Sequence, residues 1–202
     1  ILPDKFIGEA WSFIFKPENG VTGSLFKSVL IALSVASISA ILGFFTSMVI
    51  AYHKNKKSLL VLTYLPFVLS PVIFAVCLKF YFIKLGLIGT LQGVIMAQLI
   101  IAYPYATIVF TSFWNNRIVE FQKLALTLGA TPIYIFKNLL IPLAVPVLLV
   151  VFFQCFLISW FEYGLTLIIG FGKVDRLTVK VFQNRGEANC FQATIGTSLL
   201  LC

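Results

Sequence analysis

The chain has 202 residues, of which 60% are hydrophobic and 11% are charged, with 15 Lys and Arg against 7 Asp and Glu. So apolar a composition excludes an ordinary soluble domain and predicts a polytopic membrane protein. The positive excess is typical of basic loops on the cytoplasmic side of a membrane. Because most aromatic residues lie inside apolar runs, we do not expect nucleic-acid binding.

The first predicted span covers residues 28–52, a stretch of about 25 residues without a charge. At a rise of about 1.5 Å per residue, such a helix is long enough to cross a bilayer. Small residues such as Ala36, Ser39 and Gly43 recur along it and permit close helix contact, which predicts a place inside the bundle. The basic run 53–57 follows, and short basic loops face the cytoplasm.

The second predicted span, residues 58–78, contains Pro66 and Pro71. A proline removes a backbone hydrogen bond and kinks a helix. In a membrane, the carbonyl groups freed in this way must face protein or a water-filled path. Two interpretations therefore stay open: a bent helix beside a translocation path, or a packing kink that does not contact the solute.

Three glycines, Gly86, Gly89 and Gly93, predict a turn or a short helix after Lys84. The third span is expected at residues 94–114, and Pro104 is expected to bend it.

The fourth span is expected at residues 139–159, where Gln154 should hydrogen-bond a neighbouring helix. Glu162 follows it, and an acid at the edge of a span is costly unless it is paired or in contact with water. It either lines an outer gate or lies in the headgroup region. After the short apolar run 165–169, a last run at 188–202 completes an all-α membrane helix bundle with about five spans.

A different kind of segment, residues 120–146, lies between the third and fourth spans. Its amphipathic pattern predicts two short helices, at 119–128 and 132–140. Gly129 with Pro132 soon after it is the usual signal for a helix that stops and restarts. A rigid helix–Gly–helix element at the bilayer surface is suited to docking another protein.

This segment resembles the EAA loop of binding-protein-dependent ABC importer permeases, whose pattern is EAA, three residues, Gly, nine residues and then I-x-L-P. The spacing of Ala125, Gly129 and Pro142 matches that pattern. Lys123 stands where the family has an acidic residue, and Glu120 lies one helical turn earlier. The resemblance extends over residues 24–201.

The resemblance implies a MetI-like type I ABC importer permease, nearest to those for polyamines, iron, thiamine or phosphonate. It implies an extracytoplasmic segment at 1–27, a permease domain at 28–202 and a cytoplasmic coupling loop at 117–138. The implied partners are two ATPase subunits that bind ATP, a second permease subunit, and an extracytoplasmic solute-binding protein. The implied location is a bacterial-type plasma membrane. The residues expected to couple to the ATPase are Glu120, Lys123, Leu124, Ala125, Gly129, Ala130, Thr131 and Pro142, and those expected on the path are Pro66, Pro71 and Glu162.

The sequence holds no GxxxxGK[ST] motif, no HExxH and no GxSxG, so we expect neither an ATP site nor a catalytic centre in this chain. We expect no cofactor and no metal site, and the four cysteines should be packing residues. No signal peptide is visible, and we expect a fragment that lacks at least an N-terminal span. The alternative function is a stand-alone, ion-coupled secondary transporter, for which Glu162 would be the candidate ion-coupling group.

Overall fold

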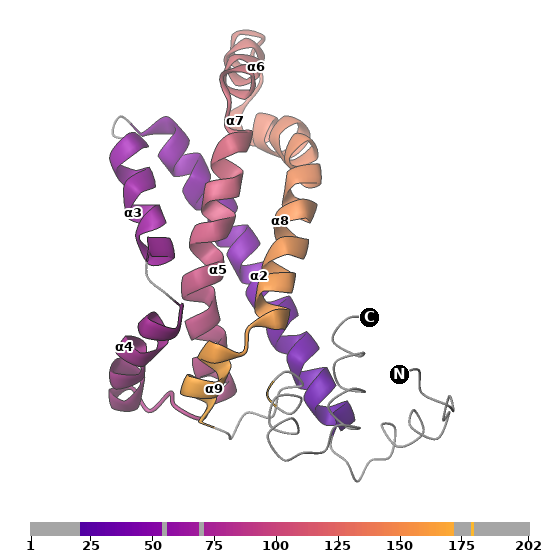
Figure 1. Cartoon of the computed structure of the whole chain (residues 1–202). Coiled ribbons are helices and arrows are strands. Elements are labelled where there is room, and N and C mark those ends of the chain that lie inside the picture. Colours follow the sequence, from indigo (N-terminus) through magenta and orange to yellow (C-terminus); the bar gives the residue numbers. More distant parts are fainter. Residues whose placement is uncertain (1–20, 54–55, 69–70, 172–178, 180–202) are drawn as a thin grey trace, which may run out of the picture.

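A computed structural model describes residues 21–53, 56–68, 71–171 and Val179. The elements in this part of the chain are all helices, which confirms the predicted all-α class. In chain order they are α2 (Val21–Tyr52), α3 (Lys56–Val68), α4 (Pro71–Lys84), α5 (Leu91–Phe113), α6 (Asn116–Thr127), α7 (Pro132–Ile135), the π-helical turn η2 (Phe136–Leu140), α8 (Ile141–Phe161) and α9 (Gly164–Gly170). Figure 1 shows them as an elongated bundle.

Three helical stretches of the described residues are long and apolar enough to cross a membrane: Gly23–Tyr52, Leu91–Phe113 and Pro132–Phe161. They correspond to the first, third and fourth predicted spans. The helix α2 begins at Val21, earlier than predicted, so Lys27 lies inside it. The fifth predicted run, 188–202, lies outside the described residues.

The prediction of a single bent helix for the second span was wrong, because the structure divides this stretch between α3 and α4. Pro66 lies in the last turn of α3, and Pro71 is the first residue of α4. A proline is favoured at a first helical position and disrupts a helix interior, so two prolines this close favour two helices. In Figure 1, α3 lies at the end of the bundle where α2 ends, and α4 lies towards the opposite end.

The main core lies where α2 packs against α5 and α8. Ala36, Ser39 and Gly43 are buried there, which confirms the prediction that the small-residue helix packs inside the bundle. A Cβ atom built on Gly43 would lie 2.7 Å from the Cβ atom of Ala106 on α5, closer than such atoms ever approach. The glycine is therefore what allows α2 and α5 to touch.

The predicted turn before α5 is confirmed. Gly86 and Gly89 have positive φ angles of 66° and 71°, which glycine adopts without strain. The backbone N–H of Gly89 donates to the carbonyl oxygen of Ile169 at 2.9 Å, so the turn is tied to α9. Helix α9 has 7 residues and is too short to cross a membrane, as predicted.

The described cysteines differ in their surroundings. Cys155 is buried, as expected of a packing residue, whereas Cys77 is exposed. Cys190 and Cys202 lie outside the described residues.

Candidate functional site

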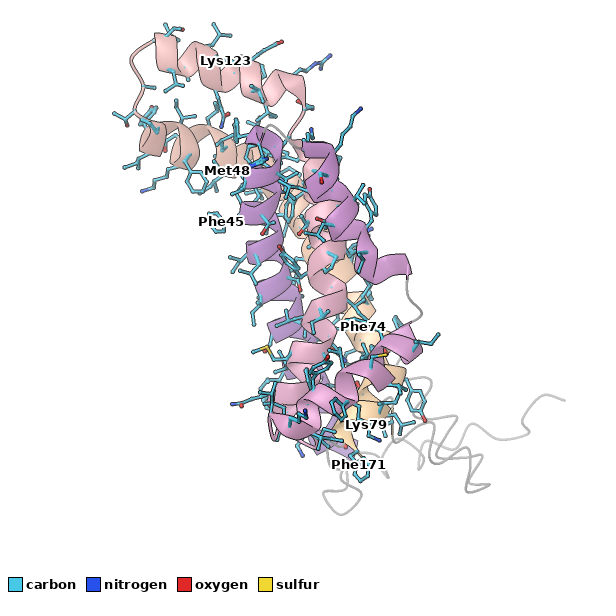
Figure 2. The ribbon with its side chains drawn as sticks, turned by 90° about the vertical axis from the view of Figure 1, so that its left-hand side faces the viewer. Phe45, Met48, Phe74, Lys79, Lys123 and Phe171 are labelled. Atoms are coloured by element: carbon cyan, nitrogen blue, oxygen red, sulfur yellow. The ribbon has the colours of Figure 1, made fainter. Side chains whose placement is uncertain are left out.

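The segment 116–140, called the projecting loop below, extends beyond one end of the bundle. It lies at the same end as the end of α2 and the start of α3, where His53, Lys56 and Lys57 of the basic run are found (Figure 1). Figure 2 shows that it leans to one side of the bundle, with Lys123 on its outer arm. The predicted first helix and the predicted break at Gly129 are confirmed.

The two limbs join the bundle in different ways. The first limb, α6, follows α5 after a break at Trp114 and Asn115. The second limb was predicted as a separate short helix, and this was wrong: α7 passes through η2 directly into α8. The backbone N–H of Ile141 donates to the carbonyl oxygen of Phe136, five residues earlier, and so closes a π turn next to Pro142. The ring of Pro142 opposes a regular α turn at this position, which accounts for the wider one.

Hydrogen bonds fix both ends of α6. At its start, the Asn115 side-chain oxygen accepts from the N–H of Ile118 at 3.1 Å. At its end, Gly129 has a φ angle of +83°. The N–H of Gly129 donates to Leu126 and the N–H of Ala130 donates to Ala125, each at 3.0 Å. These two bonds form a Schellman motif, which closes the helix and turns the chain sharply.

The second limb starts with its own cap. The Thr131 hydroxyl accepts from the N–H of Tyr134 at 3.4 Å, and Pro132 occupies the first helical position. Both choices favour a helix start, so the turn between the limbs is defined on each side of Gly129. The projecting loop is therefore a rigid, sharply bent element rather than a flexible connection.

The loop has a buried side and an exposed side. Ile118, Ile135 and Leu140 are buried against the bundle, and Ala125 and Ala130 are half-buried beside them.

On the exposed side, Leu124 is 58% exposed, Leu128 84% and Ile133 80%. Glu120, Lys123, Thr131 and Pro142 are exposed as well. The predicted coupling residues thus divide into those that fix the shape of the projecting loop and those whose exposed side chains can contact a partner.

Glu162 lies at the other end of α8, far along the bundle from the projecting loop (Figure 1). Its carboxylate accepts from the backbone N–H of Leu165 at 2.9 Å and so caps the start of α9. A negative charge is favoured at the N-terminus of a helix. This contact gives Glu162 a structural role that the sequence did not predict.

Next to Glu162, a polar cluster joins three helices. Gln98 on α5 accepts from the Ser159 hydroxyl at 2.6 Å and donates to the Thr166 hydroxyl at 3.1 Å. Gln98, Ser159 and Glu162 line a cavity of about 10 Å³, roughly enough for one water molecule. Gln98 and Thr166 were not among the site residues predicted from the sequence, although a Gln inside an apolar span indicates a hydrogen bond to a neighbouring helix. The side chains of Pro66 and Pro71 lie outside the described part, so the predicted grouping of Pro66, Pro71 and Glu162 on a transport path stays a prediction.

At the same end of the bundle, the Lys79 ammonium group lies 5.1 Å from the centre of the Phe171 ring, and Figure 2 shows the two side chains together. Among the described residues, no group of three or more His, Cys, Asp or Glu side chains is placed to hold a metal ion.

Residues 42–202 match the family described as binding-protein-dependent transport system inner membrane component. The chain belongs to this family of ABC importer permeases. This confirms the resemblance seen in the sequence. The family consists of transport subunits of the inner membrane, which are not themselves enzymes.

Three relatives support the assignment. The chain is 28% identical over 171 residues to the molybdenum transport system permease protein ModB of Mycobacterium bovis and, with the same figures, to ModB of Mycobacterium tuberculosis. These alignments cover 78% of this chain and 64% of ModB. It is 24% identical over 169 residues to the inner membrane ABC transporter permease protein YcjP of Escherichia coli, covering 81% of this chain and 59% of YcjP. The chain thus spans slightly less than two thirds of the length of these relatives.

Proposed function

We propose that this chain is the membrane permease subunit of an ABC importer and that the projecting loop is its docking site for the ATPase. One observation carries the proposal: the projecting loop, whose two helices are both capped, extends beyond the bundle and exposes Leu124, Leu128 and Ile133. Large apolar side chains that gather on a surface outside the lipid are typical of a protein–protein interface. Lys123 and Glu120 border this surface and supply charges for its rim.

The loop's connections to the bundle support a coupling role. Closure of the ATPase dimer on ATP would move the projecting loop as one body, because its first limb is capped around Gly129 and its second limb at Thr131. The second limb continues into α8 and the first is joined to α5, so the movement reaches two long apolar helices directly. Rigid-body rocking of these helices would open the transport path to the outside.

Family membership supports the remaining partners. We propose a second permease subunit, two ATPase subunits that carry ATP, and an extracytoplasmic solute-binding protein. The chain would lie in a bacterial-type plasma membrane as a multi-pass protein, with residues 117–138 in the cytoplasm and 1–27 outside. The choice of solute lies largely with the binding protein. Pro66, Pro71 and Glu162 remain our candidates for the transport path.

Purification from native membranes tests the proposal. A tagged chain, solubilised in mild detergent, should retain an ATPase subunit, and the reconstituted complex should take up solute only when ATP is supplied. A chain that purifies alone and supports uptake driven by a proton or sodium gradient would instead establish the alternative, a stand-alone secondary transporter.

A further inference from the structure

We infer that an aromatic hub centred on Phe44 and Trp114 transmits movement of the projecting loop to α2. This inference rests on the proposed function and extends it to residues outside the loop. The hub is needed because α2 is not adjacent in sequence to either limb, so non-covalent contacts must carry any movement to it. It consists of Phe44, Ser47 and Tyr52 on α2, Phe110 and Phe113 on α5, Trp114, and Phe136 on η2.

Phe44 is the central ring of the hub. It is 6% exposed, and its ring centre lies 5.4 Å from that of Phe110 and 5.6 Å from that of Trp114. It also lies 6.4 Å from the ring of Phe136 on the second limb. One side chain of α2 therefore touches the helix before the projecting loop, the junction residue and the loop itself. Edge-to-face and tilted ring pairs at these distances are attractive and have a defined geometry.

Trp114 is fixed to α2 by a buried hydrogen-bond chain. Its indole N–H donates to the Ser47 hydroxyl oxygen at 2.9 Å, and that hydroxyl donates to the backbone carbonyl of Phe44 at 2.7 Å. Trp114 is 3% exposed and Ser47 is fully buried, so neither group has water as an alternative partner. Because Trp114 directly precedes the cap of α6, its position sets where the first limb leaves the bundle.

Two further contacts attach α2 to the limbs. The Tyr52 hydroxyl at the end of α2 donates to the Gln122 side-chain oxygen on α6. The ring of Phe45 stacks on that of Phe136, with centres 6.3 Å apart, and Figure 2 places Phe45 on the side towards which the loop leans. The close contact at Gly43 and Ala106 then holds α2 to α5 one residue away from the hub. A shift of either limb must therefore displace α2 or break several of these contacts.

The test uses the purified complex with its ATPase and follows α2 directly. A cysteine replaces Leu30, which lies on α2 and is 41% exposed, after the native cysteines have been replaced. The rate of its reaction with a maleimide is compared with and without ATP and vanadate. We expect the rate to change about threefold or more in the otherwise unaltered chain, and Trp114→Phe to reduce that change to less than about 1.5-fold while ATPase binding and ATP hydrolysis persist.

Trp160→Phe is the matched control. It removes the same indole N–H from α8, where Trp160 stacks on Phe156 at 5.8 Å outside the hub. This variant should keep the full ATP response. Ser47→Ala should lose the response as Trp114→Phe does, and the double variant should be no worse than either single one, since both changes remove the same bond.

The outcomes separate this inference from the proposed function. A full ATP response in Trp114→Phe would overturn the hub while leaving the permease assignment intact. A chain without an ATPase and without any ATP response would overturn the assignment itself. If the Trp114→Phe chain does not assemble with its ATPase, Tyr52→Phe is tested instead. This variant keeps the ring beside Trp114 but removes the hydrogen bond to Gln122. An undiminished ATP response of the Leu30→Cys label in this variant would contradict transmission through the hub.

Discussion

The backbone N–H of Ala130 donates to the carbonyl oxygen of Ala125 at 3.0 Å, and this bond closes the first limb of the projecting loop around Gly129. The closure requires a positive φ angle at Gly129, which side chains of L-residues oppose. The angle between the limbs thus depends on one residue without a side chain.

Replacing Gly129 should separate backbone strain from steric contact. A Cβ atom at this position would meet nothing within 4 Å, so only the φ angle of +83° opposes a side chain. Gly129→Val should abolish ATP-driven uptake and leave membrane insertion intact, because a β-branched residue is severely strained there. Gly129→Asn, the control, should retain most activity. Wild-type uptake by the Val variant would contradict the role of the projecting loop as a rigid coupling element.

Gly43→Ala should destabilise the bundle by about 1–3 kcal/mol, since its new Cβ atom would lie 2.7 Å from that of Ala106. Thermal unfolding in detergent, followed by size-exclusion chromatography, measures the effect. The pair Gly43→Ala with Ala106→Gly should recover part of the loss, because it removes the closest contact. Equal stability of Gly43→Ala and the unaltered chain would show that α2 and α5 can separate freely.

Variants of Glu162 should distinguish a helix cap from a gate. Glu162→Gln keeps an oxygen acceptor for the N–H of Leu165, whereas Glu162→Ala removes it and should cost about 1 kcal/mol of stability. If the charge also serves an outer gate, Glu162→Gln should alter uptake at unchanged stability. Unaltered uptake by Glu162→Gln would restrict the residue to its capping role.

Gln98→Leu should cost more stability than Ser159→Ala. The first removes the bonds to both Ser159 and Thr166, and the second removes only one of them. Polar contacts between membrane helices contribute about 0.6–2 kcal/mol each, so the difference should be measurable by thermal unfolding in detergent. If Ser159→Ala proves the more damaging change, Gln98 is not the centre of this cluster.

Local rules explain which features the sequence predicted. Gly129 and Pro132 signal a stop and a restart within four residues, and the structure has both. Gln154 was expected to find a partner inside the membrane, and the Tyr105 hydroxyl donates to it at 2.5 Å. Such predictions succeed because a single backbone preference, or the cost of an unsatisfied polar group, decides the outcome.

Features that depend on distant residues were not predictable in this way. The bond between Trp114 and Ser47 joins residues 67 positions apart, and no local pattern indicates it. The division of the second span into α3 and α4 was missed because Pro66 and Pro71 were expected to bend one helix rather than to separate two.

The most direct test of the account is a cross-link from Leu128, which is 84% exposed and caps no helix through its side chain. Leu128→Cys, in a chain without the native cysteines, should capture an ATPase subunit in native membranes, and ATP should change the yield. Tyr81→Cys is the control, because Tyr81 is 63% exposed on α4 near the other end of the bundle and should capture none. A Leu128→Cys chain that reacts with maleimide but captures no ATPase would contradict the docking role.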